Sequence, residues 1–394
     1  MGTVNKVNNI TLPLEHSSRK LFYSTLNAFR GIACLVVVFF HAVSGFSSNQ
    51  NLNNTLMTLG NIALCFFFML SGFVNFRPYI VAVIKKERPI VGGAGFLLRR
   101  LFRTMPAYWL ALTILILLPV DARLAGNDYP AYYFLYHIYK YPDAIYSGIF
   151  VSWSIVVEVF FWIPLAIISI LITRFSFLYG KKFLAFLFSF YSLVVLFSNL
   201  YLYNLLKANP HDERQWFNFA QWHRFAIGEI FAITVVYLYI KHKNKVEGFF
   251  NRSGLLIYLA TIASIIFVVY LGFPDWQKGD SSSLRAYFAQ IVMLLPSMLL
   301  LVVGTLTPLN KSLFFGKRIF QLFGKWSYEI YLFHAVALYF LTYLQESLPF
   351  PQIFNIFTIF PLALSLSVLY AIFCEKYLNK PLSRVIKKYG SSAE

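Results

Sequence analysis

The sequence predicts an all-α polytopic membrane protein, a bundle of about ten transmembrane helices with both termini in the cytoplasm. Of its 394 residues, 58% are hydrophobic and only 13% are charged, whereas a soluble protein carries about 25% charged residues. Apolar runs of about 20 residues, the length that crosses a bilayer, recur along the whole chain. The distribution of lysine and arginine between these runs predicts the orientation.

The spans are expected, in order, at residues 28–48, 58–76, 104–121, 150–173, 183–203, 217–240, 253–272, 286–305, 324–344 and 352–374. They divide the chain into a cytoplasmic N-terminal tail (1–25), a transmembrane domain (26–376) and a basic cytoplasmic tail (377–394). The first 20 residues lack an apolar core, so we expect no cleavable signal peptide.

The formal net charge of +18 is mainly a topology signal. Basic clusters fall in every second connecting segment, on the side of the N-terminus: Lys85–Lys86, Arg99–Arg100, Lys181–Lys182, "KHKNK" at 241–245 and "RVIKK" near the C-terminus. The positive-inside rule places that side in the cytoplasm, so the expected location is the cytoplasmic (inner) membrane. This pattern predicts no nucleic-acid partner, but it leaves cations available for binding an anion.

Within the first span, the stretch "RGIACLVVVFFH" (30–41) begins with Arg30 and ends with His41. Eleven steps of about 100° amount to roughly three helical turns, so both side chains lie on one face, about 16 Å apart along the axis. Taken singly, Arg30 could be a snorkelling interface anchor and His41 a buried, hydrogen-bonded histidine. Because ionisable groups inside a membrane are costly and usually face a polar cavity, two on one face indicate a polar wall.

Other spans also carry polar groups. In "VSWSIVVEVFFW", Glu158 lies at a depth similar to that of His41, so the carboxylate could orient or charge-pair with the imidazole. The alternative is a structural Glu158 paired with Arg224 or with a tyrosine. Tyr328, Tyr331 and His334 in "GKWSYEIYLFH" share one side of a span, where they serve either a substrate or helix packing.

The segment "LLRRLFRTMPAYW" gathers Arg99, Arg100 and Arg103 within about one helical turn, followed by Tyr108. The arginines are either ordinary positive-inside charge or a site for a cytoplasmic phosphate-bearing ligand, because guanidinium binds phosphate bidentately. From these residues alone, two classes fit. One is an enzyme that uses a cytoplasmic anionic donor on an outer acceptor, and the other is a transporter or flippase for an anionic or lipid-linked sugar substrate.

A series of motifs in chain order resembles those of the transmembrane acyltransferase family called acyltransferase 3. They are "LNAFRGIACLVVVFFH", "FFFMLSGF", "RRLFRTMPAYW", "SWSIVVEVFFW", "RFAIGEIFA", "GKWSYEIYLFH" and "KYLNKPLSRV", and they cover nearly the whole chain. The resemblance implies a membrane-embedded O-acyltransferase. Such an enzyme moves an acyl group, most simply acetyl, from cytoplasmic acyl-CoA to a hydroxyl of a cell-surface polysaccharide or lipid-linked glycan.

The resemblance also implies residue roles. The catalytic candidates are His41, Glu158 and Arg30. The candidates for binding the acyl-CoA donor are Arg99, Arg100, Arg103, Arg30, Ser71 and Tyr108. The candidates for binding the acceptor are Trp153, Ser154, Arg224, Tyr328, Tyr331 and His334. His41 acts either as general base on the acceptor hydroxyl or as a nucleophile that becomes acylated.

Two positions depart from the family pattern. The sequence also contains few residues that indicate how the acceptor is bound. Asn27 stands where the family has Asp, and Asn379 stands where it has Glu, with Glu375 one turn earlier as a candidate substitute. The tyrosines of 129–146 fit either stacking on sugar rings or an aromatic belt. The expected partners are membrane lipids, acyl-CoA and the glycan or lipid-linked sugar acceptor, with no nucleic acid. No metal is expected either, because His41, His334 and Glu158 lack a diagnostic ligand spacing.

Overall fold

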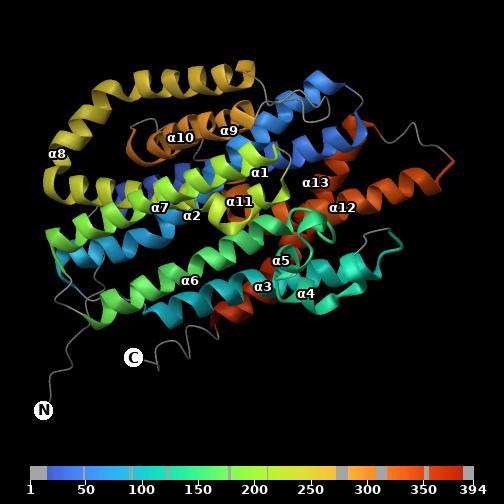
Figure 1. The fold of residues 1–394 in the computed structure, drawn as a ribbon, viewed down its shortest axis with the longest axis horizontal. Coiled ribbons are helices and arrows are strands. Elements are labelled where there is room, and N and C mark those ends of the chain that lie inside the picture. Colours follow the sequence, from blue (N-terminus) through green and yellow to red (C-terminus); the bar gives the residue numbers. More distant parts are fainter. Residues whose placement is uncertain are drawn as a thin grey trace, which may run out of the picture.

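The computed structural model is built from α-helices, and the part of the chain that it describes contains no β-strand (Figure 1). The described residues are 16–384 except 48, 88, 90–91, 121–123, 176–178, 211, 272–282, 308–316 and 350–354. Most of the segment between the predicted spans 253–272 and 286–305, and most of both tails, therefore lie outside the described residues. The all-helical prediction is confirmed.

The long helices are α1 (His16–Phe46), α2 (Gln50–Lys85), α3 (Gly93–Leu117), α6 (Ser152–Arg174), α7 (Lys181–Ala208), α8 (Asn218–Leu271), α12 (Ser327–Ser347) and α13 (Ile356–Cys374). Shorter helices are α4 (Tyr129–Tyr133), α5 (His137–Lys140), α9 (Ser283–Val292), α10 (Leu294–Leu306) and α11 (Arg318–Lys325). Single turns complete the fold: η1 (Ala125–Asn127), η2 (Pro142–Ala144), η4 (Glu213–Trp216) and η8 (Glu375–Asn379).

Within the described residues, eight helical stretches are long and apolar enough to cross a membrane, which makes the chain a multi-pass membrane protein. One of them contains two of the predicted spans, because α8 breaks its helical geometry at His242 (φ −138°). Figure 1 shows α8 turning back, with α10 between its two arms in this view. The predicted span 324–344 corresponds to α12, which falls outside the eight. The count of ten stays a prediction.

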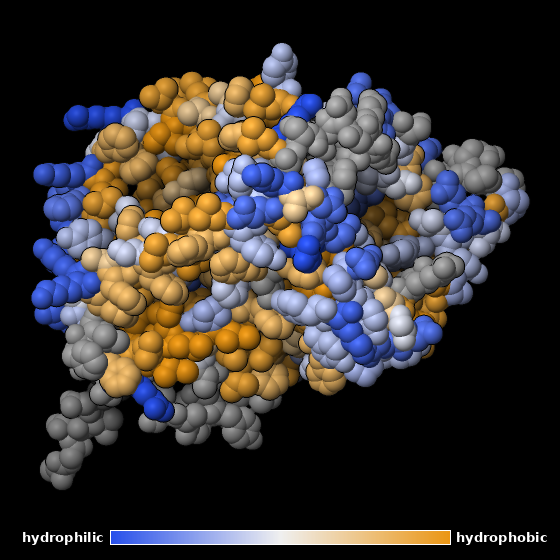
Figure 2. All heavy atoms as spheres, in the orientation of Figure 1, coloured by the Kyte–Doolittle hydropathy of each residue, from blue (hydrophilic) through white to orange (hydrophobic). Residues whose placement is uncertain are grey.

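Basic side chains gather at one end of the bundle, which we call the basic end. It contains the C-terminal end of α2 at Lys85, the N-terminal end of α7 at Lys181 and the exposed turn of α8 at 241–245. Figure 2 shows hydrophilic atoms along the edge where α8 turns, and a broad hydrophobic face beside them. This is the surface expected of a bundle set in a bilayer with one basic interface.

Helices α2 and α8 pack along much of their length, and a glycine sets how closely they approach. A Cβ atom built on Gly228 would lie 2.0 Å from the backbone oxygen of Met69. Small residues at such crossings let helix backbones touch, which is how helices gain packing energy in a membrane. The glycine of the "RFAIGEIFA" motif is therefore a packing residue.

A second close crossing holds α1 against α11, which directly precedes α12. A Cβ atom on Gly324 would lie 1.8 Å from the backbone oxygen of Asn27. The side-chain amide of Asn27 donates to the backbone oxygen of Gln321 at 2.9 Å. The crossing therefore fixes α1, and with it the wall carrying Arg30 and His41, against the start of α12.

The segment between α3 and α6 is tied to α3 by hydrogen bonds, two of which reach backbone oxygens of α4. The Tyr108 hydroxyl donates to the backbone oxygen of Tyr132 at 2.9 Å. The Trp109 indole donates to the backbone oxygen of Tyr133 at 2.8 Å. The short helices α4 and α5 are thus anchored at the end of the bundle away from the basic end.

Candidate functional site

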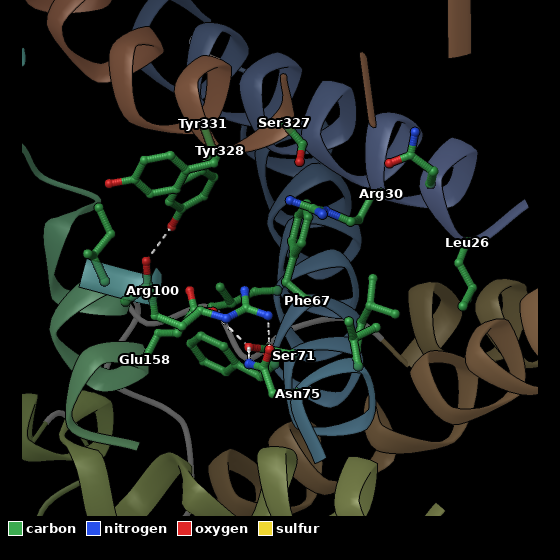
Figure 3. Close-up of a pocket in the computed structure, with 17 residues that line it drawn as sticks. Leu26, Arg30, Phe67, Ser71, Asn75, Arg100, Glu158, Ser327, Tyr328 and Tyr331 are labelled. Atoms are coloured by element: carbon green, nitrogen blue, oxygen red, sulfur yellow. Dashed lines mark hydrogen bonds between the residues drawn. The ribbon is translucent and has the colours of Figure 1, made fainter. Parts of the chain in front are cut away.

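Five helices surround a cavity of about 210 Å³ that we call the arginine cavity. Its charged lining residues are Arg30 from α1, Arg100 from α3 and Glu158 from α6. The rest of its lining is Leu26, Asn27, Leu64, Phe67, Phe68, Leu70, Ser71, Val74, Asn75, Ser154, Ile155, Ser327, Tyr328 and Tyr331. Figure 3 shows Arg30 reaching from α1 into the space that Glu158 and Arg100 also face.

A chain of hydrogen bonds organises one wall of this cavity. The Ser71 hydroxyl donates to a carboxylate oxygen of Glu158 at 2.7 Å. The Asn75 amide donates to the Ser71 hydroxyl at 3.2 Å, and Arg100 donates to the amide oxygen of Asn75. Glu158 and Arg100 are therefore linked through two polar side chains of α2.

Arg30 differs from Arg100 because no hydrogen bond or ion pair of the described residues engages its guanidinium. The lining of the arginine cavity thus holds two guanidinium groups and one carboxylate. This excess of positive charge in a partly buried site attracts an anion more strongly than it would in water. The cavity therefore suits a ligand that carries negative charge.

A second cavity of about 390 Å³, the histidine cavity, adjoins the first. His41 lines it together with Val37, Phe40, Met57, Gly60, Asn61, Leu64, Tyr146, Phe150, Val151, Trp153, Trp216 and Tyr331. Leu64 and Tyr331 line both cavities and so form part of the wall between them. The Tyr331 hydroxyl lies 2.8 Å from the Ser154 hydroxyl, which holds the tyrosine across this boundary.

The hydrogen-bond partner of His41 is a second histidine. His41 Nδ1 lies 2.9 Å from His334 Nε2, and His334 Nδ1 lies 2.5 Å from the backbone oxygen of Tyr331. The two imidazole rings are close to coplanar, with centroids 5.1 Å apart and planes 21° apart. At that separation the rings meet edge to edge, as an in-plane hydrogen bond requires.

The expected pairing of His41 with Glu158 is therefore not what the structure shows. Glu158 faces the arginine cavity and is bonded to Ser71, whereas His41 faces the histidine cavity and is bonded to His334. Similar depth in the membrane did not make the two side chains partners, because they come from different sides of the Tyr331 boundary. The alternative pairing of Glu158 with Arg224 is not found either, since the Arg224 guanidinium donates to Gln290 at 3.2 Å.

The structure separates the remaining candidates into three groups. Ser71, Ser154 and Tyr328 line the arginine cavity, and Trp153 lines the histidine cavity. Arg99 and Arg103 are exposed on α3 and line neither cavity. Tyr108 and Arg224 are fully buried and also line neither, so the structure gives them no place on a donor or acceptor site.

Sequence reasoning missed several lining residues. Asn75 lies one helical turn after Ser71, and a second polar residue at that spacing on an apolar helix is a signal that could have identified it. Phe150 and Trp216 line the histidine cavity from segments outside the recognisable motifs, whereas Tyr146, which also lines it, is one of the tyrosines of 129–146 considered for sugar stacking. Only the packing of these segments against α1 and α2 brings them to His41.

Of the two departures from the family pattern, Asn27 lies at the crossing of α1 with α11, and Asn379 ends η8. Asn379 donates to the Glu329 carboxylate at 2.8 Å. Glu375 instead pairs with Lys325 and with Lys380, the second at 3.5 Å. Glu375 therefore has partners of its own, and Asn379 has a neutral side chain beside a carboxylate that a glutamate would repel.

One protein-family model matches most of the chain. The model described as an acyltransferase domain, of the acyltransferase 3 family, matches residues 23–374. The chain belongs to the acyltransferase 3 family. The resemblance seen in the motifs is confirmed, and the protein is an acyltransferase. The searches of curated proteins and of solved structures return no match.

Proposed function

We propose that this acyltransferase moves an acyl group, most simply acetyl, from a cytoplasmic acyl-CoA to a hydroxyl of a cell-surface polysaccharide or lipid-linked glycan. The observation that carries the proposal is the pair of adjoining cavities. One holds two arginines, the other holds His41, and they share Tyr331 as a wall. In this proposal the basic end lies in the cytoplasm, with both termini, and the membrane is the inner membrane.

Coenzyme A is an anion with a long, slender pantetheine arm. Arg30 and Arg100 would bind its negative charge in the arginine cavity, since charge-assisted hydrogen bonds from guanidinium are among the strongest in proteins. Arg99 and Arg103, exposed on the same helix as Arg100, would attract the nucleotide end from solution. The thioester would then have to reach past Tyr331 toward His41.

His41 supplies the chemistry that acyl transfer to a hydroxyl needs. As a general base it takes the hydroxyl proton while the acceptor oxygen bonds to the thioester carbonyl carbon. The carbon–sulfur bond then breaks, and the coenzyme A thiolate takes the proton from the imidazolium. Base catalysis of this kind contributes about 10²- to 10⁴-fold in rate. The route through an acyl-histidine stays open, and label retained on denatured protein in the absence of acceptor would identify it.

The acceptor would enter the histidine cavity from the end away from the basic end. Trp153 and Trp216 lie with ring centroids 5.0 Å apart, and Tyr146, which is 44% exposed, lines the same cavity. Aromatic faces at a cavity mouth suit the apolar faces of sugar rings. Tyr132 does not take part in this way, because its ring is buried against His137.

The test uses purified protein, radiolabelled acetyl-CoA and a cell-envelope glycan extract. We expect label transfer by the wild type and a loss of about 100-fold or more in His41→Ala, with acetyl-CoA binding retained. The matched control is His223→Gln, which alters a buried histidine bonded to Ser198 that lines neither cavity. A folded wild type that neither binds acetyl-CoA nor transfers label would overturn the choice of donor.

A further inference from the structure

The bonds around His334 fix where its single proton sits. A neutral imidazole carries one N–H donor and one bare nitrogen acceptor. His334 Nδ1 lies 2.5 Å from the backbone oxygen of Tyr331, and a carbonyl oxygen can only accept. His334 Nδ1 therefore carries the proton, which leaves His334 Nε2 as an acceptor.

The bare Nε2 of His334 in turn fixes the proton of His41. Its Nδ1 lies 2.9 Å from the bare Nε2 of His334, so His41 Nδ1 must be the donor. A neutral His41 then has no proton on Nε2. No hydrogen bond of the described residues engages that nitrogen, and His41 lines the histidine cavity.

We propose that His334 is a positioning residue that holds His41 in the Nδ1–H tautomer, so that the bare Nε2 faces the histidine cavity as the base. The inference rests on the proposed function, since it assigns a role to the base of that reaction. His334 has no exposed surface and lines neither cavity. Its influence on the reaction therefore passes through His41 and not through contact with a substrate.

The arrangement also favours the transition state over the ground state. When His41 takes a proton on Nε2, its Nδ1–H becomes part of an imidazolium, and its hydrogen bond to His334 becomes charge-assisted. Such bonds are about twice as strong as those between neutral groups. An interaction that strengthens as the proton moves lowers the barrier and not merely the energy of the bound substrate.

Packing around His41 keeps the ring in this plane. The Phe150 ring meets it edge-on at a centroid distance of 5.0 Å, and the Phe40 ring lies 4.6 Å away. These aromatic neighbours offer no strong hydrogen-bond acceptor for His41 Nδ1–H. His334 is thus the residue that selects the tautomer, while the phenylalanines limit rotation of the ring.

The first experiment compares three substitutions at one position. The Gln side-chain oxygen occupies the place of imidazole Nε2 and can accept from His41, whereas Asn is one methylene shorter and Leu has no acceptor. We expect His334→Gln to retain much of the wild-type kcat, and His334→Asn and His334→Leu to lose about 100-fold. The KM for acetyl-CoA is expected to stay unchanged in all three, because His334 lines neither cavity.

The second measurement does not depend on activity. Nitrogen-15 NMR of histidine-labelled protein in nanodiscs reports which ring nitrogen carries the proton, and a His41→Gln sample identifies the His41 signals among the seven histidines. We expect the Nδ1–H form in the wild type and its loss in His334→Leu.

The kinetic and the NMR measurements test the role of His334 separately from the proposed function. A wild-type His41 protonated on Nε2, a wild-type kcat in His334→Leu, or a His334→Gln variant as inactive as His334→Leu would each overturn the role of His334. If no transfer is found with acetyl-CoA but His41 is in the Nδ1–H form, the donor assignment fails and the tautomer assignment stands.

Discussion

The charged residues of the arginine cavity differ in how firmly they are held. Arg100 is fixed by its bond to Asn75, and Glu158 by its bond to Ser71. Arg30 projects into the cavity without a bonded partner in the described part of the chain. A preorganised cation and a free cation together suit an anionic ligand that must enter and leave.

At this residue scale, Arg100→Gln is expected to weaken donor binding. Loss of a charge-assisted hydrogen bond costs about 1.5–3 kcal/mol, or roughly 10- to 100-fold in the KM for acetyl-CoA. The kcat is expected to change little, because in the proposed function Arg100 contacts the donor equally in the ground state and the transition state. The control is Arg174→Gln, at an exposed position at the end of α6. Equal KM values for Arg100→Gln and the wild type would contradict the role of Arg100.

At the scale of elements, close contact with α8 fixes the position of α2. Helix α2 in turn contributes Ser71 and Asn75 to the lining of the arginine cavity. Gly228→Ala places a methyl group against the backbone oxygen of Met69, which cannot move without shifting α2. We expect destabilisation of about 1–3 kcal/mol, measured as a lower midpoint of thermal unfolding in detergent.

Gly248→Ala is the matched control, because it lies in the same helix with open space around its Cβ position. Its expected effect is neutral or slightly stabilising, since alanine favours helix by about 1 kcal/mol over glycine. Equal thermal midpoints for the Gly228 and Gly248 variants would show that the crossing does not depend on glycine.

The segment carrying α4 and α5 contains a histidine outside the membrane spans. Burial lowers the pKa of His137 from 6.5 to about 4, because its charged form cannot be solvated there. Between those two pH values the unfolded segment binds a proton that the folded segment does not. Its stability is therefore expected to fall by about 1.4 kcal/mol per pH unit as pH drops from 6.5 to 4.

Hydrogen exchange of residues 124–151 as a function of pH checks this expectation. His137→Gln should remove the slope between pH 6.5 and 4. Asp128 contributes in a separate window, because its bond to Lys140 lowers its pKa and its stabilising effect is lost only at more acidic pH. A wild-type segment whose protection is constant from pH 6.5 to 4 would contradict the burial argument.

At the scale of the whole molecule, the basic end is expected to lie in the cytoplasm and so to set the orientation in the membrane. The three native cysteines are buried, so the wild-type chain offers no reactive thiol at its surface. Lys243→Cys at the basic end is expected to react with an impermeant maleimide only after cells are opened. Tyr129→Cys, at a position 49% exposed near the opposite end, is expected to react in intact cells. The reverse pattern would invert the proposed topology.

The sequence by itself determined the class of the molecule, because apolar runs of about 20 residues and alternating basic segments act locally. It also identified Arg30, His41, Arg100 and Glu158, since each is an ionisable group in or beside an apolar run. Helical periodicity placed Arg30 and His41 on one face of a helix. In the structure that face lines two cavities, with Arg30 in one and His41 in the other.

Only the tertiary structure decided which of these groups meet. His41 and His334 are 293 residues apart in sequence, and Ser71 and Glu158 are 87 apart. Periodicity tells which face of a helix is polar but not which other helix lies against it or how the two are rotated. The neighbouring helix and its rotation are set by packing, for example where Gly228 and Gly324 let helix backbones touch. The close approach of α1 to α12 gives His41 a second histidine as its partner and leaves Glu158 on the far side of Tyr331.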